Sequence, residues 1–189
     1  MRNKAFSLVE VVVAVGIFAI SIVGVIGLLA PTSKSISDVR DADDASRLVG
    51  AIQEQLQTLA SSSGGWTSII GFMRLNSDVQ TDDSNASFDP SSKTYTLFAS
   101  RDGTRMGNTG NLIAWQGESP ANSLKYFEIV LIRNGDASGN GLSPTANDNT
   151  AGFLAYTIRL RWAAYLPNGL RLIDNAQKNV LLVPGAVHR

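Results

Sequence analysis

The sequence predicts an α+β fold in which a long N-terminal helix packs on an antiparallel β-sheet. Three observations support this prediction: an uncharged apolar run at residues 11–30, an apolar repeat with helical spacing after it, and short alternating strands in the rest of the chain. The chain has 189 residues, the size of one domain plus a segment outside it. We therefore expect one globular domain attached to a long apolar helix.

The apolar run has the length of a helix that crosses a membrane. Residues 11–30 contain no charged side chain, and Ser21 carries their only hydroxyl. A helix of this length spans about 30 Å, the thickness of the hydrocarbon core of a bilayer. Its many β-branched residues disfavour a helix in water, but in lipid only a helix satisfies the backbone polar groups. The basic residues Arg2 and Lys4 place the N-terminus in the cytoplasm and the rest of the chain outside.

Two simpler interpretations of this run compete. A cleaved secretory signal has an apolar core of about 7–15 residues and a small-residue cleavage site. Here the run is longer, and Pro31 follows it directly. A plain signal anchor has the right length but gives no reason for Glu10. A carboxylate at the start of an apolar helix is costly unless it is protonated or paired.

The residues around Glu10 form a pattern that explains it. The stretch Lys4-Ala5-Phe6-Ser7-Leu8-Val9-Glu10, followed by the apolar helix, resembles the prepilin cleavage and methylation motif of type IV pilins and pseudopilins. The resemblance implies that a prepilin peptidase cleaves between Ala5 and Phe6, and that Phe6 is then N-methylated. It also implies that the carboxylate of Glu10 guides assembly by pairing with the amine of a neighbouring subunit. The family usually has glycine before the cut, but Ala5 is also small and we expect cleavage to occur.

The resemblance also implies partners and a location. The partners are a prepilin peptidase, other pilin or pseudopilin subunits and the lipid of the inner membrane. The protein would be single-pass in the inner membrane, with its C-terminal domain periplasmic or extracellular, and would enter a filament after assembly. The residues after Ser7 are similar to minor pilins and pseudopilins. Segments 27–31, 160–162 and 167–169 also resemble a pilin-like group called Verru_Chthon cassette protein B.

The helix is expected to continue beyond Pro31 with one apolar face. Apolar side chains recur there at steps of three and four, and the Ser- and Gly-rich residues 61–65 end the pattern. The chain would then comprise a leader (1–5), a transmembrane and assembly helix (6–30), its amphipathic continuation (31–65) and a sheet domain with long polar loops (66–189). The apolar positions are Ile36, Val39, Ala45, Leu48, Val49, Ile52, Leu56 and Leu59.

The sheet domain is expected to contain six strands. They are predicted at residues 94–100, 112–116, 126–133, 154–166, 170–174 and 180–183, separated by loops at 76–93, 101–110, 117–123 and 134–152. In the fourth strand, apolar residues alternate with Thr157, Arg159 and Arg161, which predicts one buried and one wet face. The turn Pro167-Asn168-Gly169 predicts a hairpin over 154–174. The apolar helix face at 48–59 would cover the sheet, with Trp66, Trp115 and Trp162 in the core.

The loop at 134–152 contains a partial calcium motif. Asp136, Ser138 and Asn140 alternate before Gly141, and Asp148 lies further on, which resembles the first half of a calcium loop. Asn147 stands where a calcium loop has its bidentate glutamate, so we expect weak calcium binding at most. A plain loop without metal is the favoured interpretation, and no other cofactor is expected.

Composition argues against most enzyme classes. The chain has no cysteine, one histidine (His188), and 16 basic against 16 acidic residues. This excludes disulfides, zinc–thiolate sites and thiol catalysis, and the zero net charge gives no case for nucleic acid as partner. Asp82 and Asp83 lie in polar sequence, predicted as a loop where nothing would raise a carboxyl pKa. We therefore expect a structural filament subunit, not an enzyme. The alternative is a membrane-anchored periplasmic binding module that does not polymerise.

Overall fold

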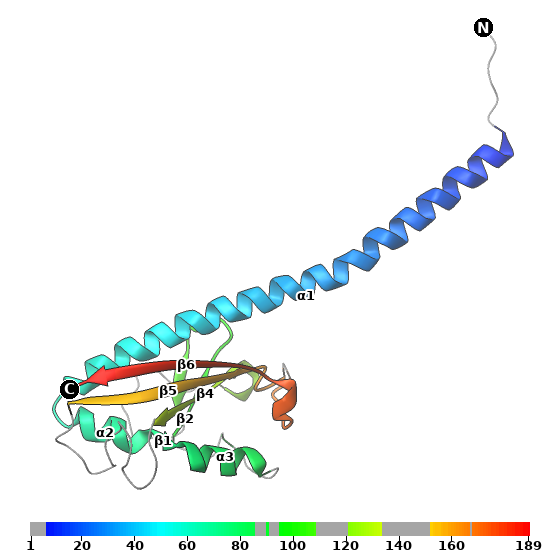
Figure 1. The fold of residues 1–189 in the computed structure, drawn as a ribbon. Helices are drawn as coiled ribbons and strands as arrows, with labels where there is room; N and C mark the ends of the chain where they lie inside the picture. Colours follow the sequence, from blue (N-terminus) through cyan, green and yellow to red (C-terminus); the bar gives the residue numbers. More distant parts are fainter. Residues whose placement is uncertain (1–6, 86–89, 91–94, 109–120, 134–151, 167) are drawn as a thin grey trace. The chain divides into compact units, whose positions relative to one another are not determined.

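The computed structural model describes residues 7–85, 90, 95–108, 121–133, 152–166 and 168–189. The chain divides into two compact units, Met1–Ala42 and Asp43–Arg189. The first helix, α1 (Leu8–Ala60), contributes residues to both units. All the other elements belong to the second unit (Figure 1).

Helix α1 is continuous and contains Pro31. The predicted continuation of the helix as far as Ala60 is therefore confirmed. Its end is closed by Ser62, whose N–H donates to the carbonyl oxygen of Leu59 at 2.9 Å. The chain then turns through Gly64, with φ +76°, into Gly65, where an added Cβ would lie 1.9 Å from the Leu59 oxygen. Only glycine fits at Gly65, so the Gly-rich sequence after the helix is a steric requirement of the turn.

The main core lies between the C-terminal part of α1 and one face of the sheet. Ala45, Leu48, Ile52 and Leu56 are buried there, so the predicted covering face at 48–59 is confirmed. A short helix that the sequence analysis did not predict, α2 (Gly65–Phe72), adds further apolar side chains to this core. The residues that α2 and the sheet supply are Trp66, Ile69, Ile70, Phe72, Leu97, Phe127, Ile129, Leu131, Leu154, Tyr156, Ile158, Leu160, Trp162 and Val187.

The sheet is built on five antiparallel strands. Their order is β3-β2-β4-β5-β6. The strands are β2 (Thr96–Ala99), β3 (Met106–Asn108), β4 (Phe127–Arg133), β5 (Phe153–Trp162) and β6 (Asn179–His188). A sixth strand, β1 (Arg74–Leu75), pairs in parallel with the end of β4. Figure 1 shows β4, β5 and β6 side by side. Predicted strand 112–116 lies outside the described residues.

The predicted hairpin over 154–174 is wrong. Strand β5 pairs along its whole length with β6, in the register Phe153↔His188 to Trp162↔Asn179. The turn itself exists: Gly169 has φ +80° and donates its N–H to the Leu166 oxygen at 2.8 Å. It joins only an isolated bridge between Tyr165 and Arg171, so residues 170–174 form no strand.

Two segments, β6 and residues 170–174, could pair with the edge of β5, and the packing of apolar side chains decides which of them does. In β6, the half-buried Leu181 and Val183 pack against the main core and Val187 lies within it. In the segment 170–174, by contrast, Leu170 and Ile173 are both 63% exposed. Turn chemistry identifies a local reversal of the chain, but the strand that buries more apolar surface becomes the partner.

The second face of the sheet is covered over β4 and part of β5, which corrects the predicted wet face. Helix α3 (Asn76–Ser84) lies where the sequence predicts a loop, and its Val79 packs against Val130 and Ile132 of β4. Arg159 and Arg161, expected in water, are only 9% and 8% exposed. Helix α3 has one buried apolar side chain, so hydrophobic periodicity could not reveal it. Strand β3 likewise falls within the predicted loop 101–110.

Strand β6 forms an edge of the sheet, and a side chain of α1 closes one end of that edge. The amide of Gln57 donates to the His188 oxygen at 3.0 Å and accepts the His188 N–H at 3.3 Å. Polar backbone groups of alternate residues point to the same side of a strand, so Pro184 also faces this edge. Proline offers no N–H to a further strand, and such placement is typical of protected edges.

Candidate functional site

Ser7 and Glu10 close the first turn of α1 through two reciprocal hydrogen bonds. The Val9 N–H donates to the Ser7 Oγ at 3.2 Å, and the Ser7 N–H donates to Glu10 Oε2 at 3.1 Å. This is the capping box Ser-x-x-Glu, which satisfies two of the N–H groups that the start of a helix leaves without partners. A carboxylate here also faces the positive end of the helix dipole. Glu10 is therefore engaged by its own chain at the start of α1.

The predicted processing residues precede this cap in the sequence. Ala5 and Phe6 lie outside the described residues, so their roles stay predictions. Glu10 is described, and it lies three residues after Ser7 in the first turn of α1. Glu10 was predicted as a functional residue but Ser7 was not, although the Ser-x-x-Glu spacing is a sequence signal for a helix cap.

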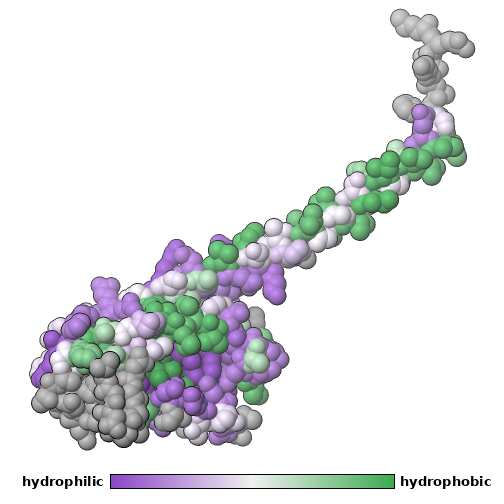
Figure 2. Space-filling model, in the orientation of Figure 1, coloured by the Kyte–Doolittle hydropathy of each residue, from purple (hydrophilic) through white to green (hydrophobic). Residues whose placement is uncertain are grey.

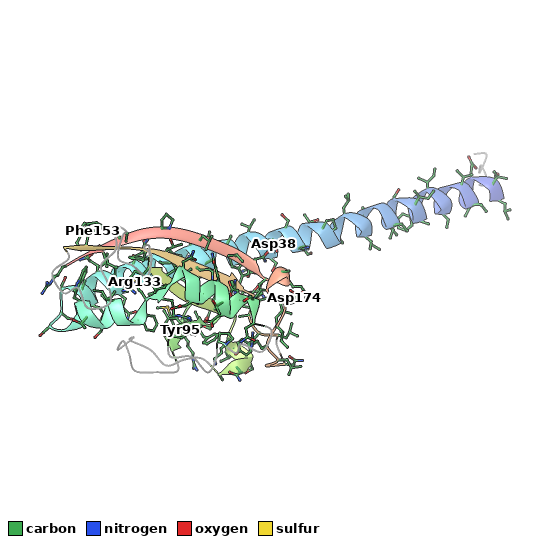
Figure 3. The ribbon with its side chains drawn as sticks, turned by 60° about the horizontal axis from the view of Figure 1, so that its bottom comes forward. Asp38, Tyr95, Arg133, Phe153 and Asp174 are labelled. Carbon is green, nitrogen blue, oxygen red and sulfur yellow. The ribbon has the colours of Figure 1, made fainter. Side chains whose placement is uncertain are left out.

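The first part of α1, from Leu8 to Leu29, exposes its large apolar side chains. Between Leu8 and Leu29 these side chains range from 41% exposed at Ile22 to 82% at Leu8. Figure 2 colours this part of α1 mostly hydrophobic, and Figure 3 shows its side chains standing out from the helix. The helix is long and apolar enough to cross a membrane, judged by length and composition alone. Apolar surface on this scale requires lipid or other apolar helices around it.

The hydroxyls of this segment are satisfied within the helix. Ser21 Oγ donates to the Ile17 oxygen at 2.8 Å, and the Thr32 hydroxyl donates to the Leu28 oxygen. Neither hydroxyl therefore needs a partner from water, which suits an apolar environment.

A buried charge network joins α3 to the second face of the sheet. Asp83 accepts two bonds from Arg161, at 2.7 and 2.8 Å, and one from Arg159 at 2.6 Å. Deeper in the domain, Lys178 Nζ lies 3.3 Å from Glu128 Oε2, and these side chains are 1% and 4% exposed. The predicted place of Asp83 in a polar loop is wrong, because α3 brings this residue onto the sheet.

The electrostatics of the network follow from its burial. Burial alone would raise the pKa of the Asp83 carboxyl, but hydrogen bonds and charge from Arg161 and Arg159 outweigh it and hold that pKa below its usual value. Burial lowers the pKa of Lys178, while Glu128 opposes the shift. The two arginines therefore favour the charged form of the Asp83 carboxylate.

A second ion pair lies beside the network. Arg74 and Asp82 are 2.6 Å apart, and the hydroxyl of Tyr95 (labelled in Figure 3) donates to the same carboxylate oxygen at 3.0 Å. The Arg74 guanidinium also lies 3.8 Å from the centre of the Tyr95 ring. Burial raises the pKa of Tyr95 to about 12. Each of these polar groups interacts with a neighbouring side chain, so the cluster has the arrangement of groups that stabilise the fold.

Two cavities open near these elements. One of about 290 Å³ adjoins the network and is lined by Asp83, Glu128, Arg161 and Asp174, the last labelled in Figure 3. Another of about 560 Å³ lies at the end of the sheet where β2 ends and β4 begins. Its charged lining residues are Arg101, Asp102, Arg105 and Lys125. Within the described part of the chain, no cluster of three or more acidic or histidine side chains is suited to a metal ion.

The remaining predicted residues divide between the core and the undescribed segments. Trp66 and Trp162 are buried in the main core as predicted, whereas Trp115 lies outside the described residues. The calcium hypothesis also stays a prediction, because its four residues lie outside the described part of the chain. These residues are Asp136, Ser138, Asn140 and Asp148.

Comparison with known proteins identifies the N-terminal segment. The family model for the prokaryotic N-terminal methylation motif matches residues 1–26. No curated protein and no solved structure matches the chain significantly. The matched segment ends inside the apolar part of α1, so the motif and the exposed helix together fit membrane anchoring. The match does not distinguish the Verru_Chthon cassette protein B group, which stays a prediction.

The motif carries consequences for processing and assembly. It is a type IV pilin-like prepilin motif, which implies processing by a prepilin peptidase and assembly with other pilin subunits. Proteins with this motif are structural rather than enzymatic. The fold agrees, because a long N-terminal helix packed on an antiparallel sheet is pilin-like.

Proposed function

We propose that this chain, which carries a type IV pilin-like prepilin motif, is a minor pilin or pseudopilin: a structural subunit of a type IV pilus or of a type II secretion-like filament. The observation that carries the proposal is the methylation motif at residues 1–26, which leads into a helix with exposed apolar side chains. The partners are a prepilin peptidase, other subunits of the filament and inner-membrane lipid. The protein is single-pass in the inner membrane, and its sheet domain is periplasmic or extracellular.

Processing would occur just before the helix cap. The peptidase removes residues 1–5, and the new amine of Phe6 is methylated. Among the described residues the helix begins at Leu8, and the Val11 N–H donates to the Ser7 oxygen. Ser7 therefore caps the helix two residues after the proposed cut.

Glu10 would then act as the assembly carboxylate. After cleavage the chain has no lysine or arginine before Lys34, so the Phe6 amine is the one cation that the apolar segment supplies. A carboxylate has two oxygens and accepts several hydrogen bonds. Glu10 can therefore keep its bond to the Ser7 N–H while its second oxygen pairs with the Phe6 amine of a neighbouring subunit. Such pairing would fix the axial register between subunits and relieve the desolvation cost of the charge.

The test is the variant Glu10→Gln in cells that assemble the filament. Glutamine can still accept the Ser7 N–H, because the capping box tolerates Glu or Gln, so the helix start is kept and only the charge is lost. The expected result is unchanged membrane content, unchanged mature mass beginning at methylated Phe6, and at least a tenfold smaller share in sheared filaments. Ser7→Ala is the matched control: it removes the cap hydroxyl, keeps the carboxylate and should leave assembly largely intact.

One observation favours a second candidate function. The cavity of about 560 Å³ in the sheet domain has the size of a ligand site, which suits a membrane-anchored binding module that does not polymerise. That candidate predicts that Glu10→Gln changes neither localisation nor function. An unchanged share of the variant in filaments would remove the assembly role of Glu10. Wild-type protein that is absent from sheared filaments, or that still begins at Met1, would remove the filament proposal and favour the binding module.

A further inference from the structure

The larger cavity lies where three chain segments meet. The register Ala99↔Phe127↔Trp162 places the end of β2, the start of β4 and the end of β5 in one row of the sheet. The segments that leave this row line the cavity: the turn after β2, residues 123–126 before β4, and residues 163–166 after β5. The volume of about 560 Å³ lies within the usual range for small-ligand sites, roughly 300–1,000 Å³.

Hydrogen bonds fix the walls of this cavity. The Tyr126 N–H donates to the Ala99 oxygen at 2.9 Å, and the Ala164 N–H donates to the Tyr126 oxygen at 2.9 Å. Ala163, the residue before Ala164, has φ +30°, a backbone conformation that residues other than glycine rarely adopt. Such local strain persists only where the surrounding structure holds it, and it is frequent at functional sites. The cavity is therefore preformed.

The one carboxylate among the lining residues is already engaged by its own turn. Asp102 Oδ1 accepts from Ser100 Oγ at 2.5 Å and from the Thr104 N–H at 3.2 Å, while the Thr104 hydroxyl lies 2.9 Å from both carboxylate oxygens. Hydrogen bonds from Ser100 and Thr104 hold the pKa of this carboxyl below its usual value. Asp102 thus shapes the turn, and among the described lining residues it is the one carboxylate against three basic side chains.

Three cations line the same cavity. They are Arg101, Arg105 and Lys125, against the single carboxylate of Asp102. Lys125 is only 7% exposed, and its Nζ lies 4.5 Å from the Phe98 ring centre and 5.5 Å from that of Tyr165. Charge in a partly desolvated site acts more strongly than charge on an open surface. An incoming anion would therefore be attracted, and a cation repelled.

The rest of the lining is apolar or aromatic. Tyr126 and Tyr165 contribute rings, and Leu124 and Leu166 contribute aliphatic side chains that are 48% and 40% exposed. A small, strongly hydrated ion such as phosphate would make no apolar contact with this surface. The lining instead matches a ligand with a negative group at one end and a ring or aliphatic body at the other.

We propose that this cavity binds an organic carboxylate that carries an aromatic or aliphatic body. Lys125 and Arg105 provide the charge for the carboxylate, while Tyr126, Tyr165 and Leu166 provide the surface for the body. The site is independent of the N-terminal motif, so it does not depend on whether the chain polymerises.

The test compares a charged probe with a neutral one of nearly the same shape. Full-length protein in lipid nanodiscs is titrated with 3-phenylpropionate and with 3-phenylpropionamide, and binding is followed by saturation-transfer NMR against empty nanodiscs. The carboxylate should bind at least tenfold more tightly than the amide, and the difference should shrink as salt is raised. Equal binding of the two probes, or binding of neither at millimolar concentration, would overturn the proposal.

Variants assign the binding to this cavity. Arg105→Gln lies at an exposed position and should weaken carboxylate binding at least threefold, and Lys125→Met at least tenfold, with binding of the amide unchanged. Arg47→Gln is the matched control, because it removes the same charge from an exposed pair with Asp43 on α1. If Lys125→Met fails to fold, as judged by tryptophan fluorescence, Arg105→Gln still decides. Equal effects of Arg105→Gln and Arg47→Gln would refute the site.

A second pair of probes tests whether the carboxylate belongs to a small free acid or to the C-terminus of a peptide. A tetrapeptide ending in phenylalanine is tested with a free C-terminus and with an amidated one. Tighter binding of the free-acid peptide than of 3-phenylpropionate would identify a peptide terminus as the ligand, and weaker binding would identify a small free acid. Either result supports the site, whereas equal binding of the free and amidated peptides together with equal binding of the two small probes contradicts it.

Discussion

Replacing Asp83 with asparagine should destabilise the sheet domain far more than its place in a polar sequence would suggest. Asp83 receives three hydrogen bonds from Arg159 and Arg161, whose side chains are each only 10% exposed. In Asp83→Asn the two guanidinium groups keep their burial but lose their main counter-charge. Glu128 is the next carboxylate, 3.8 Å from Arg161, and it already faces Lys178.

The magnitude follows from the exposure of the groups. Breaking a fully buried pair by removing one partner costs about 3–5 kcal/mol. The Asp83 side chain is 28% exposed, so water screens part of the interaction and an asparagine oxygen still accepts one bond. We expect a loss of about 2–3 kcal/mol in the free energy of unfolding, between the value for a buried pair and the roughly 0–1 kcal/mol of a surface pair.

Urea unfolding of the full-length protein in nanodiscs measures this loss, because Trp66 and Trp162 are buried in the main core and report on the second unit. Urea leaves ionic strength unchanged, unlike guanidinium salts. Asp43→Asn is the matched control, since Asp43 and Arg47 form an ion pair with side chains 60% and 76% exposed. If Asp83→Asn lowers the unfolding free energy no more than Asp43→Asn does, the network is not structural and the reasoning fails.

Three further outcomes are expected. The pKa of Asp83 is lower in the folded protein than its ordinary value of 3.8. Its contribution to stability is therefore complete above about pH 4 and is lost as pH falls through the lower folded pKa, so Asp83→Asn should flatten the acid limb of the stability curve. Gly185→Ala should cost about 1–3 kcal/mol, because its Cβ would lie 2.8 Å from the Tyr156 ring. Gly50→Ala in α1, with no atom near its Cβ, should be neutral or stabilising in the same urea assay.

The first helix could be predicted from the sequence because its signals are local and periodic. The apolar run, the helical spacing at Leu48, Ile52 and Leu56, and the glycines after Ala60 each act within a few residues. Strand β4 was predictable for the same reason, as a β-branched apolar stretch. The processing motif needed only the residues from Lys4 to Glu10, and the match at residues 1–26 agrees with it.

The parts of the fold that depend on distant partners could not be predicted from the sequence. Helix α3 carries mostly polar residues, and its place on the sheet follows from Asp83 meeting Arg159 and Arg161, which lie 76 and 78 residues later. An Arg-x-Arg alternation on a strand predicts a solvent-exposed face unless the acidic residues that pair with the arginines can be located in the sequence. The pairing of β5 with β6 is also non-local, since the turn at Gly169 offered a nearer partner. The lining of the larger cavity comes from three separate segments that no spacing rule connects.

The protection of the sheet bears on how the chain would associate with others. An open edge strand is a ready template for pairing with another chain, and proteins block such edges with proline or with covering side chains. Strand β6 has both devices: Gln57 holds the backbone of His188, and Pro184 faces the edge without an N–H. One face of the sheet is covered by α1 with α2, and α3 packs on β4 at the other face. Pairing with another chain through the edge at β6 is therefore disfavoured. The exposed apolar side chains of α1 before residue 30 are left as the surface that gains most from association, which is the division of roles that a filament built through its helices requires.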